Sequence, residues 1–308
     1  MSDRISLKDI PISESFDVEK EKSLPPVNEF KRFVRVFFRR PIVAIGFAIV
    51  IGLVVLAVFA DQIAPHDPLE FNLLNVRAAP SADYPFGTDD IGRCLLSRLI
   101  HGTRLALLTG VSTVLISAVI GITIGLVAGF GGRVTQEVVM RLTDAWISIP
   151  GIILMMLLGA IIGRGPIGLT IAIGITMFPA YIRLVFGQVL TVRQNDYIMA
   201  SFSMGDSKVR IVLKHILPNC TAPIIVVMTM MMGTAVMAEA GLSFIGLGID
   251  PPNPAWGTMT NDGRTRLATA PHLALAPGAA IVLLVFGFNM VGDGIRDALD
   301  PKMRGTLN

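Results

Sequence analysis

Residues 196–218 form the only long polar interruption between two apolar segments in the second half of the chain, and their ionisable and polar side chains are the candidates for a working site. Two helix-compatible runs, 197–204 and 208–217, flank the tripeptide Gly205-Asp206-Ser207, whose weak helix formers favour a bend. We therefore expect a short helix, a turn and a second helix that enters the apolar region. An ordinary solvated loop is the alternative that composition leaves open. The cations of the segment are Lys208, Arg210, Lys214 and His215.

Catalytic chemistry has no recognisable motif in this chain. The sequence has no GxxxxGK[ST] loop for nucleotide phosphates, no HExxH metal motif and no kinase or hydrolase signature. Cys94 and Cys220 lie far apart, and neither belongs to a CxxC or Cys/His cluster. We therefore expect no catalytic residues, no metal site and no cofactor, so any energy for work must come from a partner.

Composition places the chain in a lipid bilayer. Of 308 residues, 52% are hydrophobic and only 16% are charged, as in an integral membrane protein. The net charge is only +3, and the basic residues sit at the ends of apolar segments without an aromatic patch. Nucleic acid is therefore a poor candidate partner, and the bilayer is the expected one.

The apolar pattern predicts an all-α, polytopic membrane protein with six transmembrane helices. Residues 1–40 form a cytoplasmic tail, partly disordered and partly an interfacial amphipathic helix with a basic end, and residues 41–308 form the transmembrane domain. The first span is uncleaved, because no convincing signal-peptide cleavage site follows it. The expected spans are residues 42–60, 105–130, 138–162, 167–189, 216–238 and 277–291, with the polar loop at 191–215.

Three glycines recur every four residues in the second span. Gly121, Gly125 and Gly129 would leave one helix face smooth enough for another helix backbone to approach closely. Glycines that are merely tolerated in a membrane helix are the alternative for any single position. Three in register favour a packing seam.

Four other residues in or near the spans stand out. Arg141 and Asp144 are three residues apart and can pair on one helical face, where a structural role is favoured over a role in transport. Pro179 permits a kink in the fourth span, either static or part of a moving gate. Glu239 is costly to bury at the membrane edge, so it has either a functional role or a capping or water-exposed position.

Five sequence blocks resemble one family. Met199-Ala200-Ser201, Gly205 and His215-Ile216-Leu217-Pro218 have the spacing of the EAA motif of ABC importer permeases. The blocks FGTDDIGRCLLSR, MRLTDAWISIPGIIL, EAGLSFIGLGIDPPNPAWG and FNMVGDGIRDALDP resemble further signatures of permeases for dipeptides, oligopeptides and nickel, with Cys94 where that family usually has Asp. Together they cover residues from about 30 to 303, and they resemble the second permease of the usual pair.

The resemblance implies a type I ABC importer permease fold and a position for coupling. In that family the segment around the EAA motif is a coupling helix that docks into a groove on an ATPase subunit. By resemblance, the coupling residues are Met199, Ala200, Ser201, Met204, Gly205 and Asp206. Met199 stands where the motif has Glu, so hydrophobic docking must carry more of the contact, or another residue supplies the charge. The sequence identifies no substrate-binding residues.

The implied function is transport in the bacterial inner membrane by a multi-pass subunit that is not itself an enzyme. The implied partners are a homologous permease, two ABC ATPase subunits that hydrolyse ATP, and an extracytoplasmic solute-binding protein. Dipeptides and oligopeptides are the default solutes, with glutathione, nickel chelates and opines as other branches. An ion-coupled secondary transporter is the alternative, but the intramembrane carboxylates and related halves typical of that class are not evident. A non-transporting scaffold would leave the polar segment unexplained.

Topology gives the first prediction. Six spans with both ends in the cytoplasm place residues 61–101 and 241–271 outside, and the outside stretches then carry about half as many Lys and Arg residues as the inside ones. Cysteines introduced at Ser81 and Asn261 should react with an impermeant thiol reagent in intact spheroplasts. Protection of both positions until the spheroplasts are lysed would contradict this topology.

Overall fold

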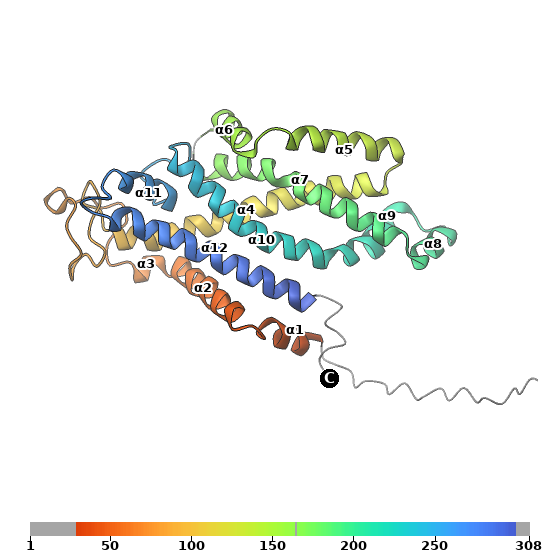
Figure 1. Cartoon of the computed structure of the whole chain (residues 1–308), viewed down its shortest axis with the longest axis horizontal. Helices are drawn as coiled ribbons and strands as arrows, with labels where there is room; N and C mark the ends of the chain where they lie inside the picture. The colour runs from red at the N-terminus through yellow and green to blue at the C-terminus, as the bar shows by residue number, and fades with distance from the viewer. Residues whose placement is uncertain (1–28, 164, 300–308) are drawn as a thin grey trace, which may run out of the picture.

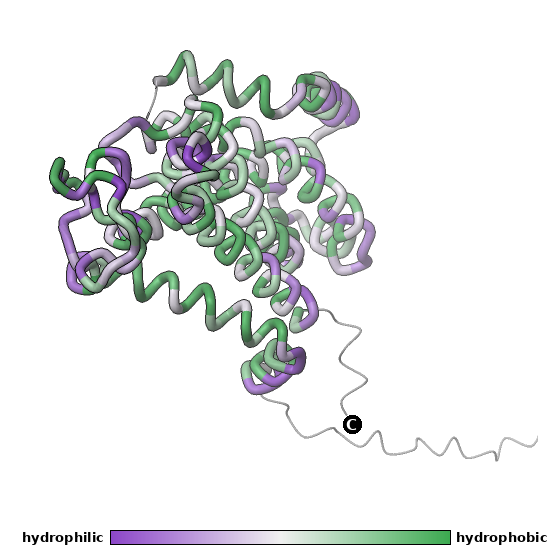
Figure 2. The backbone as a smooth tube through the Cα atoms, turned by 60° about the vertical axis from the view of Figure 1, so that its left-hand side comes forward, coloured by the Kyte–Doolittle hydropathy of each residue, from purple (hydrophilic) through white to green (hydrophobic). Residues whose placement is uncertain are grey.

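The computed structural model describes residues 29–163 and 165–299. These residues form helices and one isolated antiparallel bridge, between Thr88 and Cys94, so the expected all-α class is confirmed. The long helices run side by side along the longest axis of the molecule (Figure 1). Most residues along these helices are hydrophobic, and hydrophilic residues gather toward the helix ends (Figure 2).

Five helical stretches are long and apolar enough to cross a membrane. They are α2 (Pro41–Val58), α4 (Leu95–Phe130), α7 (Pro166–Arg193), the continuous stretch Lys208–Phe244 and α12 (His272–Leu299). The stretch Lys208–Phe244 consists of α9 (Lys208–Ile211), a π-helical turn (Val212–Ile216) and α10 (Leu217–Phe244). Several of these helices extend well beyond the expected spans, because the apolar pattern marks the part in the bilayer and not the helix caps.

The remaining helices lie mostly near the ends of the bundle. They are α1 (Glu29–Phe37), α3 (Ala60–Ile63), a 3-10 turn (Leu73–Asn75), α8 (Asp196–Ser203) and α11 (Trp256–Arg264). α8 and α9 lie at one end, and α11 with the loop that precedes α4 lies at the other (Figure 1). Residues 1–28 of the expected tail and the final residues 300–308 lie outside the described residues.

The expected third span, 138–162, is not one straight helix. α5 (Arg133–Ile147) and α6 (Gly151–Ile162) meet at an angle of 89°, and the count reaches six only if this bent pair is one span. Pro150 explains the break. Its ring disfavours helical backbone in the preceding residue, and it has no N–H to continue the hydrogen-bond ladder. Pro179, in contrast, lies inside α7, which is continuous.

The expected glycine seam is present between α4 and α7, the most extensive helix pair of the fold. A Cβ atom added at Gly121 would lie 2.5 Å from the Phe178 carbonyl oxygen and 2.5 Å from the Tyr181 Cβ. At Gly125 and Gly129 the nearest atoms would be the Cβ atoms of Val185 and Val189, at 2.9 Å and 2.7 Å. The two backbones are therefore close because α4 carries no side chain at three successive turns.

Overpacking this seam tests its role. Gly121→Leu should lower the free energy of unfolding by about 1–3 kcal/mol, because the new side chain meets backbone that cannot move aside cheaply. Gly52→Leu on α2 is the matched control, since nothing lies within 4 Å of a Cβ atom placed there. Thermal unfolding in detergent measures both variants. Equal stability of the two would contradict a packing role for Gly121.

Candidate functional site

The polar segment has the expected helix, turn and second helix. α8 ends at Ser203, and Gly205 has a φ of +85°, which a side chain disfavours. The Gly205 amide donates to the Phe202 carbonyl at 3.0 Å, and the Asp206 amide donates to the Ser201 carbonyl at 3.2 Å. This pair of bonds is the Schellman motif that ends many helices. No atom lies within 4 Å of a Cβ atom placed at Gly205, so its backbone angle is the reason that glycine fits.

A side-chain network holds the turn. The Asp206 carboxylate accepts the Ser201 hydroxyl at 2.7 Å and the Arg210 guanidinium at 3.0 Å. These two hydrogen bonds, with that from Ser201 the larger effect, lower the pKa of Asp206 from its usual 3.8. A lowered pKa means that the bonds stabilise the turn above this value and are lost only as the pH falls through the lowered one. The turn is thus held at neutral pH.

The two faces of the segment differ in burial. Ile198, Ile211 and Ile216 are fully buried, in a cluster that includes Val185 and Val189 of α7. The ring of Phe202 also stacks on Phe130 at the end of α4, with centroids 5.7 Å apart. These contacts fix the segment to the bundle.

The opposite face is open to the surroundings. Met199 is 64% exposed and Met204 is 78% exposed, and Ala200 and Gly205 are exposed beside them. Of the six expected coupling residues, four therefore lie at the surface, and the other two, Ser201 and Asp206, hold the turn. Exposed methionines give an adaptable apolar surface that suits contact with a partner.

A π-helical turn joins the segment to α10. It spans Val212–Ile216, just before Pro218, which cannot donate a backbone hydrogen bond. The Asn219 side-chain amide donates to the His215 carbonyl at 2.6 Å across this joint. The stretch from Lys208 to Phe244 stays continuous despite the proline.

The expected ion pair between Arg141 and Asp144 is wrong. Asp144 pairs instead with Arg183 of α7, at 2.7 Å. The partner comes from a neighbouring helix because α5 lies against α7, which spacing along α5 could not show. The pair thus links two helices, in keeping with a structural role.

Glu239 lies near the far end of α10, and it is only 4% exposed. It accepts a hydrogen bond from the Ser243 hydroxyl at 2.8 Å. Water exposure therefore does not account for this carboxyl group. At the next residue α10 lies close to α11, since a Cβ atom at Gly257 of α11 would meet the Ala240 carbonyl oxygen at 2.5 Å.

Two family comparisons match the chain. Residues 121–305 match the family described as binding-protein-dependent transport system inner membrane component. Residues 28–80 match the N-terminal transmembrane domain of oligopeptide transport permease C. The chain belongs to the ABC importer permease family.

Curated relatives agree with this assignment over nearly the whole chain. The dipeptide transport system permease protein DppC of Alkalihalophilus pseudofirmus is 38% identical over 92% of this chain and 93% of its own length. The di/tripeptide permease protein DppC of Pseudomonas aeruginosa is 42% identical, over 85% and 88%. The glutathione permease protein GsiD of Escherichia coli is 41% identical, over 94% of both chains.

A solved structure shares the fold. A chain of the MetNI methionine ABC transporter, in an inward-facing conformation, aligns with a TM-score of 0.54 and 20% identity, over 66% of this chain and 96% of its own. The protein is therefore a multi-pass permease subunit of an ABC importer in the bacterial inner membrane, and not an ion-coupled secondary transporter. Permeases of this family work with ATPase subunits and a binding protein.

Removal of the Asp206 side chain tests the turn network. In Asp206→Ala the permease loses the acceptor for Ser201, which is only 2% exposed, and for Arg210. Amide hydrogen exchange across residues 201–211 should become faster, because the turn opens more often. Glu137→Ala on α5 is the control, since Glu137 is exposed and outside this segment. Unchanged exchange in Asp206→Ala would show that Gly205 alone sets the turn.

Proposed function

We propose that this permease imports short peptides or related small solutes, glutathione among them, with energy from ATP hydrolysed by two partner ATPase subunits. The relatives support this solute class, since they are named for dipeptide, di/tripeptide and glutathione transport. A homologous permease forms the second half of the translocation pathway, and an extracytoplasmic binding protein delivers the solute.

We assign the contact with an ATPase to the exposed face of α8 and the turn that follows it. One observation carries this proposal: an exposed apolar tip, with Met199 and Met204, sits on a segment whose other face is anchored by Ile198 and Ile211. A segment anchored in this way transmits a push to the bundle, whereas a free loop would absorb it. Because Met199 occupies the position of the motif Glu, apolar contact carries most of the docking.

The same assignment orients the molecule. Lys208, Arg210 and Lys214 lie at the α8 end, and basic residues favour the cytoplasmic side of a bacterial membrane. The end with α11 and the loop before α4 then faces outward, toward a binding protein. The two ends thus divide the work between energy input and solute entry.

The coupling proposal is tested at Gly205. In Gly205→Val a β-branched side chain must adopt a φ near +85°. Left-handed backbone costs L-residues about 1–2 kcal/mol, and the cost for a β-branched residue exceeds this range. We expect normal insertion in the membrane, at least about tenfold lower peptide uptake, and loss of the ATPase subunits on co-purification, because a change of this size exceeds a tenfold shift in equilibrium.

Gly187→Val is the matched control. Gly187 lies on α7 in helical backbone, and no atom lies within 4 Å of a Cβ atom placed there. Both variants are compared with the wild-type permease at equal membrane abundance. If Gly205→Val retains normal uptake and normal ATPase recovery, the segment is an ordinary solvated loop and the coupling assignment fails.

A further inference from the structure

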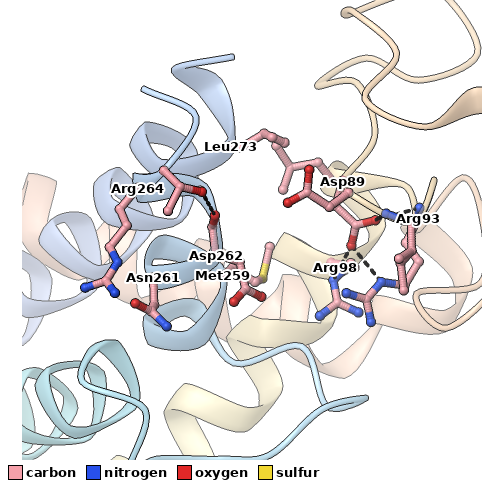
Figure 3. Close-up of a pocket in the computed structure, with 13 residues that line it drawn as sticks. Asp89, Arg93, Arg98, Met259, Asn261, Asp262, Arg264 and Leu273 are labelled. Atoms are coloured by element: carbon pink, nitrogen blue, oxygen red, sulfur yellow. Dashed lines mark hydrogen bonds and ion pairs between the residues drawn. The ribbon is translucent and has the colours of Figure 1, made fainter. Parts of the chain in front are cut away.

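A pocket of about 410 Å³ lies at the end of the bundle opposite α8. It opens between the loop that precedes α4 and the helix α11, two parts of the chain that are distant in sequence (Figure 3). Its size falls within the range of about 300–1,000 Å³ that is usual for small-molecule sites. Met259 and Leu273 give it apolar surface, and most of its other side chains are charged.

One wall of the pocket is a fixed cationic cluster. The Asp89 carboxylate accepts from the Arg93 guanidinium at 2.6 Å and lies 3.7 Å from the Arg98 Nε. Arg98 is only 3% exposed, and it also donates to the carbonyl oxygens of Pro68 and Pro252. Asp90 also lines the pocket, but it pairs with Arg77 and lies 3.6 Å from the Arg266 Nε. Arg93 and Arg98 therefore share the single carboxylate of Asp89, and this wall keeps an excess positive charge. Contacts with three segments of the chain hold Arg98 in this position.

The opposite wall carries an unpaired carboxylate. Asp262 of α11 has no cation within ion-pair distance among the residues that the structure describes. Figure 3 shows it across the gap from Arg98 and Asp89. The neighbouring Arg264 does not neutralise it, because the Arg264 guanidinium lies over the ring of Phe244, 5.6 Å from the centroid.

Loss of water from one side of the Asp262 carboxyl raises its pKa, and Arg93 and Arg98 oppose this effect across the pocket. A bound cationic group would favour the ionised carboxylate and oppose this rise in pKa. The pocket therefore has separated charges of opposite sign with open space between them.

We propose that this pocket binds a small zwitterion, a short peptide with free termini, whose α-ammonium group pairs with Asp262 and whose carboxylate pairs with Arg93 and Arg98. A plain anion would meet repulsion from Asp262, and a plain cation would meet repulsion from the arginines. A molecule with both groups satisfies both walls. This inference deepens the proposed function and rests on it, because it places the peptide at the outward end of the permease.

The test measures which end of a peptide each residue recognises. The full-length chain in lipid nanodiscs is titrated with Ala-Ala, with N-acetyl-Ala-Ala and with Ala-Ala amide. We expect Ala-Ala to bind at least about tenfold more tightly than either blocked peptide, since each block removes one charge-assisted contact.

Asp262→Asn should lower the affinity for Ala-Ala about tenfold, because the partner of the ammonium group is lost, and should not lower that for N-acetyl-Ala-Ala, an anion that Asp262 repels. Arg93→Gln should lower the affinity for Ala-Ala and should not lower that for Ala-Ala amide, a cation that Arg93 repels. Asp83→Asn is the matched control, because Asp83 is exposed on the same loop and does not line the pocket. Asp262 is exposed, so we expect Asp262→Asn to keep the fold even if Arg93→Gln disturbs the loop.

Equal binding of free and blocked peptides, or an equal loss for both in Asp262→Asn, would overturn the inference. The outcome is separate from that of the proposed function. If the permease imports peptides with its ATPase but shows no Asp262-dependent binding, only the pocket assignment is contradicted. If the chain binds Ala-Ala as expected but assembles with no ATPase, only the coupling proposal is contradicted.

Discussion

Backbone hydrogen bonding inside the bilayer is the constraint on which the rest of this permease depends. Lipid offers no partner for an exposed N–H or C=O group, so a spanning chain must satisfy these groups within helices. The stretch Lys208–Phe244 keeps its helix through Pro218 by a π-helical turn and through Pro223 as well. Turns with left-handed backbone, such as that at Gly205, lie outside the long spans. Apart from the break at Pro150, irregular backbone, and with it the capacity for recognition, is concentrated near the ends of the bundle.

One helix contacts both candidate sites. α10 begins beside the anchored face of the coupling segment, where Ile216 and Cys220 are fully buried. Its other end packs closely against α11, which carries Asp262 of the outward pocket. α10 also packs against α4, α7 and α12 along its length. A displacement at α8 therefore has a continuous, close-packed route to the pocket wall, without the need for a flexible connection.

Charge is handled differently at the two ends. At the α8 end, Asp206 accepts hydrogen bonds from Ser201 and Arg210, and the side chains of Met199 and Met204 are exposed nearby. At the α11 end, the Asp89 cluster leaves positive charge uncompensated while Asp262 remains without a cation. The first arrangement suits a protein surface that docks by apolar contact. The second suits a small charged solute, because a ligand with both an ammonium and a carboxylate group can pair with the opposite charges on the two walls of the pocket.

The sequence alone determined the apolar spans, the glycine seam and the bend at Gly205, because each depends on local composition or on a repeat along one helix. The break at Pro150 had a local signal too, but the 89° angle depends on where α6 packs. Tertiary structure alone decided that Asp144 pairs with Arg183 and that Arg98 and Asp262 line one pocket. These partners are distant in sequence, and only the packing of helices settles which of many charged side chains meet.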